Sequence, residues 1–120
     1  MSATSSETLA AKHCVPCEGG VPRVEKAQAE GFLETLPGWK LSEDAKKIRR
    51  DWTMKDFMAA IDFFNRVAQV AEDEGHHPDL HLEGYRQARI ELSTHAIGGL
   101  SENDFILAAK IDQLPVQLKK

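Results

Sequence analysis

The sequence predicts an α+β fold in which a four-stranded antiparallel sheet carries three helices packed on one face. The chain has 120 residues, a length that suits a single domain. A long amphipathic segment follows Thr53, and residues 87–92 alternate between apolar and polar side chains. Glycine and proline separate the elements into the order helix, two strands, helix, two strands, helix. Hairpins that alternate with helices are typical of an antiparallel sheet covered on one side.

The first predicted helix and hairpin occupy residues 24–52. Apolar side chains spaced by three and four positions predict a helix over 24–36, and Pro37 with the following glycine ends it. Residues 39–41 and 46–52 predict two short strands joined by a polar turn, and therefore a hairpin.

The longest predicted helix begins after Thr53 and runs to about Glu74. Thr53 is a suitable N-cap, with Asp56 three residues later. Gly75 suits the C-terminal end of a helix, and Pro78 prevents its continuation. One predicted apolar stripe contains Phe57, Ala60, Ile61, Phe64, Val67, Ala68 and Ala71.

Two further strands and a final helix complete the predicted fold. Residues 80–83 and 87–92 alternate, and Gly84 between them marks a turn or a bulge. Ser101 is the expected N-cap of the last helix, with Asp104 at the third helical position. Because such a sheet keeps an open face or edge, we expect the protein to associate with itself.

Composition and charge exclude several classes of partner. The chain has 15 Lys+Arg and 19 Asp+Glu, which gives a formal net charge of −4, whereas nucleic-acid-binding proteins usually show a basic excess or a basic face. No stretch approaches the roughly 20 apolar residues that span a bilayer. The N-terminus lacks the basic and apolar regions of a secretory signal. We therefore expect a cytoplasmic protein that binds neither nucleic acid nor membranes.

Residues 1–22 are expected to form a flexible extension in front of a single domain over 23–120. Small and polar residues dominate this segment, and proline and glycine break any regular pattern. Cys14 and Cys17 form a CxxC motif, and two cysteines cannot build a disulfide framework. Three interpretations remain: a tail with two reduced thiols, a zinc site completed by His13 or by a second subunit, or a redox pair.

Two adjacent histidines, His76 and His77, lie at the end of the long helix and are held there by Pro78. Helix carbonyls and nearby carboxylates favour a protonated imidazole, and imidazoles as a class suit proton transfer at neutral pH. His95 follows the strand over 87–92, where functional side chains are common. Such imidazoles could bind and protonate one small molecule.

Two other interpretations of the histidines remain open. A histidine at a helix C-terminus can serve only as a favourable charge partner of the last carbonyl groups. Zinc binding is less favoured, because adjacent histidines seldom bind one ion and no cysteine or carboxylate lies at a familiar spacing to them. The histidines available for such a site are His76, His77, His81 and His95.

The spacing of these residues resembles the signature of the pterin-4a-carbinolamine dehydratases. The resemblance covers about residues 28–114, and similar Cys-x-Pro-Cys leaders occur on a plant- and bacterial-type branch of that family. It implies a four-stranded antiparallel sheet with three helices on one side, assembled as a homodimer or as a homotetramer of two dimers. The pattern is Glu72-x3-His76-His77-Pro78-x6-Tyr85-x9-His95-x8-Asp104.

The resemblance implies a dehydratase that needs no metal and no redox cofactor. The 4a-hydroxyl of a 4a-hydroxytetrahydropterin leaves as water while a ring nitrogen loses a proton, which gives a quinonoid dihydropterin. His76 and His95 would be the acid/base pair, and His77 would complete the catalytic histidines by binding and orienting the pterin.

The remaining site residues are implied to line or support the pocket. Backbone at Gly75, Ser93 and Thr94 would line it. Glu72 and Asp104 would hold the imidazoles in place.

Trp39 is implied either as a wall for the flat ring or as a core residue. Six residues instead of the usual five separate Pro78 from Tyr85, so we expect a bulge or a longer turn there. Ala96 stands where several family members carry a glutamate.

Two alternative functions follow from the same resemblance. Relatives act as dimerisation cofactors of a homeodomain transcription factor, and dehydratase-like proteins assist Rubisco assembly. The full set of three histidines, His76, His77 and His95, argues against a purely structural role. The branch with the CxxC motif has also been connected with molybdopterin metabolism, so a molybdopterin-related pterin is a further candidate substrate.

Overall fold

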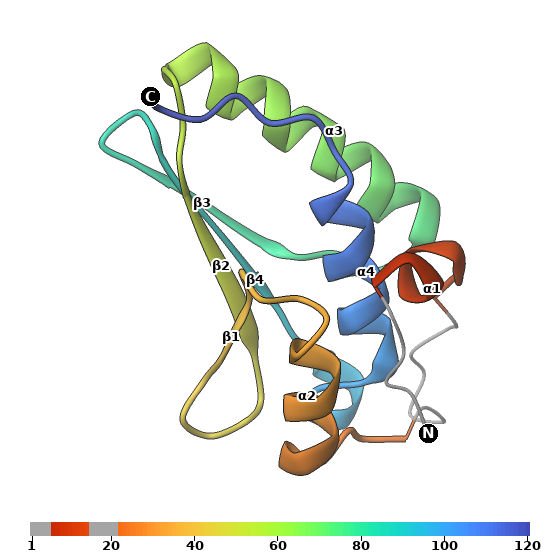
Figure 1. The fold of residues 1–120 in the computed structure, drawn as a ribbon. Coiled ribbons are helices and arrows are strands. Elements are labelled where there is room, and N and C mark those ends of the chain that lie inside the picture. The colour runs from red at the N-terminus through yellow and green to blue at the C-terminus, as the bar shows by residue number, and fades with distance from the viewer. Residues whose placement is uncertain (1–5, 15–21) are drawn as a thin grey trace.

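The computed structural model describes residues 6–14 and 22–120 and confirms the α+β class with one four-stranded antiparallel sheet. Figure 1 shows α3 and α4 on one face of the sheet, with α1 beside α4. Several element boundaries differ from the predicted ones by a few residues. The elements are α1 (Ser6–Ala11), α2 (Lys26–Leu33), β1 (Lys40–Leu41), β2 (Ile48–Thr53), α3 (Phe57–Glu74), β3 (Asp79–Glu83), β4 (Gln87–Leu92), the 3₁₀ helix η1 (His95–Ile97) and α4 (Glu102–Asp112).

The strand order β1-β2-β4-β3 determines which loops lie close together. In the central pair Ile48 of β2 lies opposite Leu92 of β4, and at the edge Asp79 of β3 lies opposite Glu91 of β4. The start of β3 and the end of β4 therefore share one end of the sheet. The loop that carries His76 and the loop that follows Leu92 meet there.

The two faces of the sheet differ as the alternation predicts. Ala88, Ile90 and Leu92 of β4 are buried under the helices. The open face carries charged pairs instead, such as Arg89 Nε with Asp51 Oδ1 at 2.7 Å.

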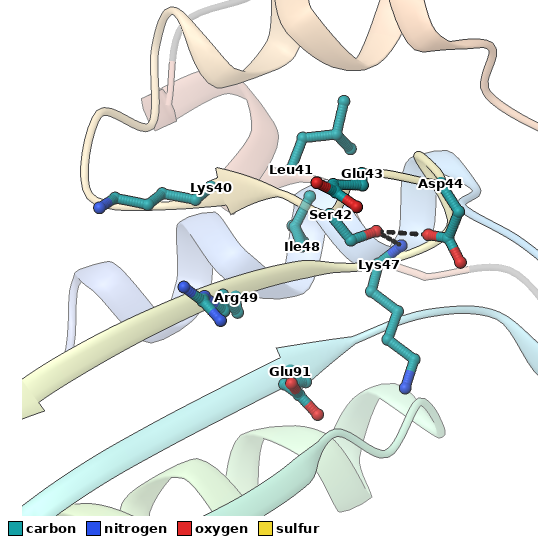
Figure 2. Close-up of a pocket in the computed structure, with 9 residues that line it drawn as sticks. All are labelled: Lys40, Leu41, Ser42, Glu43, Asp44, Lys47, Ile48, Arg49 and Glu91. Atoms are coloured by element: carbon teal, nitrogen blue, oxygen red, sulfur yellow. Dashed lines mark hydrogen bonds between the residues drawn. The ribbon is translucent and has the colours of Figure 1, made fainter.

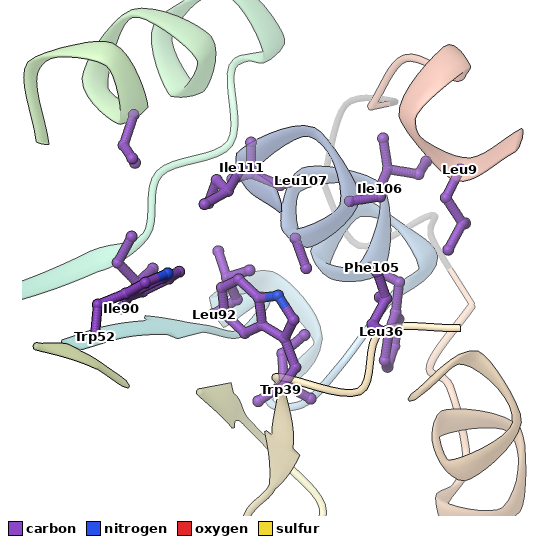
Figure 3. Packing of buried hydrophobic residues seen from close by; sticks show 14 of the residues in the cluster. Leu9, Leu36, Trp39, Trp52, Ile90, Leu92, Phe105, Ile106, Leu107 and Ile111 are labelled. Atoms are coloured by element: carbon purple, nitrogen blue, oxygen red, sulfur yellow. The ribbon is translucent and has the colours of Figure 1, made fainter. Parts of the chain in front are cut away.

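Aliphatic and aromatic side chains fill the core between the sheet and the helices (Figure 3). Trp52 contacts Trp39 edge to face, with ring centroids 5.9 Å apart, and contacts Phe63 of α3 at 5.0 Å. Phe32 of α2 stacks on Phe105 of α4 at 4.7 Å. These contacts hold α3 against the sheet and α2 against α4.

Trp39 belongs to this core, with only 3% of its surface exposed. Its indole Nε1–H donates to Asp112 Oδ1 at 2.9 Å, and Arg50 Nη1 donates to the same oxygen at 2.7 Å. Burial raises the pKa of the Asp112 carboxyl above its ordinary value, and the two donors act in the opposite direction. The placement fits the core interpretation of Trp39.

The start of α3 corrects the predicted cap. Thr53 is the last residue of β2, where it lies opposite Gln87, so it cannot also cap the helix. Asp56 is the N-cap instead, and its carboxylate accepts the Ala59 N–H at 2.8 Å. The buried stripe is also rotated, because Phe57 is 48% exposed and Ala68 is exposed. The buried residues of α3 are Ala59, Ala60, Phe63, Val67 and Ala71.

The described part of the N-terminal segment contains a helix that the sequence analysis does not predict. Leu9 is fully buried and Ala10 is 8% exposed, and both pack against the core (Figure 3). Lys110 Nζ of α4 donates to the Ala10 carbonyl at 2.8 Å. Most residues of α4 are buried, and a helix that is buried on more than one side needs a second neighbour besides the sheet. α1 is that neighbour. The predicted boundary between an extension over 1–22 and a domain over 23–120 stays a prediction.

Glu74, the last residue of α3, joins this segment to the rest of the protein. Its carboxylate, 7% exposed, accepts the Cys14 N–H at 2.7 Å and His13 Nδ1–H at 3.1 Å. Lys110 Nζ lies 3.5 Å away. Burial alone would raise the pKa of the Glu74 carboxyl. The hydrogen bonds from Cys14 and His13, with the charge of Lys110, outweigh burial and hold this pKa below its ordinary value.

The lowered pKa of Glu74 predicts how stability changes in acid. The free energy of unfolding of wild type should exceed that of Glu74→Gln above the ordinary titration range of a glutamate. The difference should shrink as the pH falls through the lowered pKa, because the protonated carboxyl then resembles the amide. Urea denaturation at a series of pH values measures both free energies. A difference that stays constant with pH would contradict the prediction.

Candidate active site

The turn after α3 sends two consecutive imidazoles in different directions. Gly75 ends the helix in the left-handed conformation, with φ of 65°, which glycine adopts at little cost. The next N–H, that of His76, donates to the Ala71 carbonyl at 3.2 Å. The side chain of His76 is 7% exposed, whereas that of His77 is 64% exposed.

His76 is held inside the protein by a carboxylate from another helix. Its Nε2–H donates to Asp104 Oδ1 at 2.6 Å, and the Asp104 side chain is fully buried. The second oxygen, Oδ2, accepts the Thr94 hydroxyl at 2.8 Å and the Ser101 N–H at 3.0 Å. The Thr94 and Ser101 hydroxyls are 2.8 Å apart. Asp104 therefore has its hydrogen-bond acceptors occupied by three partners and fixes the position of the imidazole.

The local sequence explains why Asp104 lies at this place. Ser101 is the N-cap of α4, as predicted, and Asp104 is the third helical residue. The two residues form a capping box, in which each side chain accepts the other residue's backbone N–H. The same carboxylate that caps the helix has one oxygen left for His76. The Ser-x-x-Asp spacing signals the cap, but it does not signal the bond to the histidine.

The other two predicted histidines are exposed. His77 forms a hydrogen bond with the Glu72 carboxylate in the last turn of α3. His95 begins η1, directly after the buried Thr94. Thr94 N–H donates to the Gly99 carbonyl at 2.7 Å, which closes the loop around His95.

The structure thus brings most of the predicted site residues to one end of the sheet. Glu72 lies in the last turn of α3, and Gly75, His76 and His77 follow on the α3–β3 loop. Ser93, Thr94 and His95 follow β4, and Asp104 of α4 joins the group through His76. The sequence did not predict that Thr94 and Ser101 hold the Asp104 carboxylate in place.

Trp39 and Tyr85 do not join this group. Trp39 lies in the core, as described above. Tyr85 is 57% exposed in the β3–β4 turn, at the opposite end of the hairpin from the histidines. The ladder from Asp79 to Glu83 is unbroken, so the chain lengthens in the turn and forms no bulge. Gly84 and Tyr85 in that turn both have positive φ, 52° and 56°.

Within residues 6–14 and 22–120, no group of three or more His, Cys, Asp or Glu side chains is arranged to hold an ion. His81 forms a hydrogen bond with Glu91 at 3.2 Å, on the open face of the sheet. Cys17 and the rest of the predicted CxxC motif after Cys14 lie outside the described residues.

A hollow of about 490 Å³ opens beside the β1–β2 hairpin (Figure 2). Its rim contains the turn of that hairpin, where the Ser42 hydroxyl and the Lys46 N–H donate to Asp44 and lower the pKa of its carboxyl. The hollow lies at the histidine end of the sheet but carries balanced charge. The charged residues in its lining are Lys40, Lys47 and Arg49 with Glu43, Asp44 and Glu91.

The fold and this site define a small α+β protein with a buried histidine–aspartate pair and two exposed histidines on the adjoining loops. A family model described as pterin 4 alpha carbinolamine dehydratase matches residues 22–114. The chain belongs to the pterin-4-alpha-carbinolamine dehydratase family.

Known relatives agree with this assignment. Pterin-4-alpha-carbinolamine dehydratase 2 of Arabidopsis thaliana, a mitochondrial protein, is 52% identical over 112 residues, which are 91% of this chain and 60% of that protein. A Halorhodospira halophila protein, named provisionally as such a dehydratase, is 50% identical over 89% of this chain and 97% of its own. A Brucella melitensis crystal structure, described as a transcriptional coactivator/pterin dehydratase, superposes with a TM-score of 0.71 at 30% identity over 76% of this chain and 96% of its own.

Within residues 6–14 and 22–120, none of the helices combines the length and the apolar character needed to cross a bilayer.

Proposed function

We propose that the protein converts 4a-hydroxytetrahydropterin to quinonoid dihydropterin and water, with His76 and His95 as the acid/base pair. The observation that carries the proposal is the buried hydrogen bond from His76 to Asp104 at 2.6 Å, next to the loop that bears His95. A buried imidazole with a fixed orientation is what proton transfer to or from a bound molecule requires.

The reaction needs only two proton transfers. The C4a–O bond breaks, and the leaving hydroxyl takes a proton from the acid and departs as water. A ring nitrogen gives its proton to the base, and its electron pair completes the new double bond. Atoms and charge therefore balance without an oxidant or a metal ion. A positioned acid or base of this kind raises the reaction rate by about 10²–10⁴-fold.

Asp104 serves the reaction through His76. A carboxylate that accepts one ring N–H fixes both the tautomer and the orientation of an imidazole, and it stabilises the imidazolium form. Because Thr94 and Ser101 hold the other oxygen of Asp104, the carboxylate cannot rotate away. The dyad is rigid before the substrate arrives.

His77 binds the pterin from the exposed side of the site. Its ring is oriented by Glu72, and the exposed His95 lies on the neighbouring loop. Backbone at Gly75, Ser93 and Thr94 lines the space between these loops. Pterin heads are flat and carry several hydrogen-bond donors and acceptors, which suits imidazoles and backbone groups.

For the oligomeric state and the cellular location, we keep the expectations from the sequence as proposals. We propose a homodimer or homotetramer in the cytoplasm. β3 is an edge strand, and Leu80 on it is 40% exposed, which supports pairing with a second copy.

A direct assay tests the function. A phenylalanine hydroxylase generates 4a-hydroxytetrahydropterin in the cuvette, and its decay is followed spectroscopically with and without the purified protein. We expect the decay to accelerate in proportion to protein concentration. A decay equal to the spontaneous rate would refute this substrate and would favour an unusual pterin or an assembly role.

A further inference from the structure

We propose that Glu74 is a positioning residue for the His76–Asp104 pair, because it ties residues 12–14 across the ends of α3 and α4. Glu74 is not among the residues to which the resemblance gives a role. The role in turnover rests on the proposed function, whereas the structural part of the inference does not.

The N-terminal segment is fastened to α4 on one side. Leu9 is buried against this helix, and Lys110 Nζ binds the Ala10 carbonyl at 2.8 Å. Lys12 Nζ pairs with Glu102 at 2.8 Å, at the first turn of α4. The Cys14 thiol donates to the Asn103 carbonyl at 3.6 Å, one residue before Asp104. The segment therefore contacts the same helical turn that carries the catalytic carboxylate.

On the other side, the segment is fastened to α3 through Glu74. Glu74 Oε1 accepts the Cys14 N–H at 2.7 Å, and Oε2 accepts His13 at 3.1 Å. Glu74 lies two residues before His76, immediately ahead of the left-handed Gly75. Only 7% of the Glu74 side chain is exposed, so its bond to the Cys14 N–H is partly shielded from water, whereas the His13 ring is 84% exposed.

These contacts form a closed connection behind the catalytic pair. Asp104 stands on α4 and His76 follows α3, so the 2.6 Å hydrogen bond between them depends on how the two helix ends are placed. Residues 12–14 join the same two ends a second time, through Cys14 to Glu74 and through Cys14 to Asn103. Displacements of about 1 Å in an active site can cost about 100-fold in rate. A second connection limits such displacements.

The test compares Glu74→Ala with Asp73→Ala. Asp73 is the neighbouring acid on the exposed side of α3, where it accepts Gln69 Nε2 at 3.1 Å, so the control removes the same charge outside the connection. We expect Glu74→Ala to lower kcat by about 10-fold with KM within about twofold, and Asp73→Ala to change neither beyond about twofold. Glu74→Gln, which keeps an oxygen for the Cys14 N–H, should fall between wild type and Glu74→Ala.

A second measurement is independent of activity. The ring proton of His76 in its bond to Asp104 is followed by ¹H–¹⁵N NMR, and its exchange with water should be at least about fivefold faster in Glu74→Ala than in Asp73→Ala. Equal exchange and equal kcat in the two variants would overturn the inference. If Glu74→Ala does not fold, Glu74→Gln takes its place. A Glu74→Gln variant whose kcat and ring-proton exchange equal those of Asp73→Ala would then overturn the inference. Wild type without dehydratase activity would refute the proposed function, while the exchange data would still decide the positioning role.

Discussion

Replacement of His76 by alanine is expected to lower kcat for the dehydration of 4a-hydroxytetrahydropterin by about 10²–10⁴-fold. The imidazole is the one histidine ring of the site that is buried and held by a buried carboxylate. Alanine removes the proton carrier and leaves the exposed His77 and His95 in place. The measurement is the spectroscopic decay of enzymatically generated substrate, with the spontaneous rate subtracted.

His81→Ala is the matched control for this variant. His81 lies on β3 with its ring 44% exposed, and it pairs with Glu91 on the open face of the sheet. Its replacement should leave kcat within about twofold of wild type, because exposed side chains outside the site contribute little. A His76→Ala protein that is folded by circular dichroism and retains wild-type kcat would exclude this histidine from proton transfer.

Replacement of Asp104 by alanine is expected to lower the free energy of unfolding by about 3–5 kcal/mol, in addition to its effect on activity. The fully buried carboxylate accepts from His76 and Thr94 and also from the Ser101 N–H. Alanine removes the acceptor of the buried His76 ring N–H and of the Ser101 N–H, and it removes half of the capping box of α4. Urea denaturation, followed by tryptophan fluorescence from the buried Trp52 and Trp39, measures the change.

Glu102→Ala separates this effect from a general weakening of α4. Glu102 occupies the first turn of the same helix, but its side chain is 45% exposed and pairs with Lys12. An exposed ion pair of this kind contributes about 0–1 kcal/mol. A loss in Asp104→Ala no larger than that in Glu102→Ala would show that the buried network does not stabilise the fold.

The strands and the final helix could be predicted because their signals are local. The alternation in 87–92 gives β4, and Ser101 with Asp104 gives the start of α4. The face that α3 buries was not predictable in detail. Phe63 and Phe64 are adjacent, and only the position of Trp52 in the sheet, whose ring contacts Phe63 at 5.0 Å, determines which of them enters the core.

The candidate site was predictable in its residue types but not in its supports. The resemblance pointed to His76 and Asp104, and the structure places them in contact. The hydroxyl of Thr94 carries no local signal, because its function depends on a residue ten positions away that a separate helix supplies. α1 could not be predicted either, because a six-residue helix forms through packing against α4 and not through its own propensity.

One carboxylate, that of Asp104, both caps α4 and anchors His76. The start of α4 and the His76–Asp104 pair therefore depend on the same side chain. Under the proposed function, a molecule in which the first turn of α4 has locally opened has also released the imidazole of His76 and cannot turn over. Local opening of that turn thus sets an upper limit on the active population, even at temperatures where the sheet remains intact.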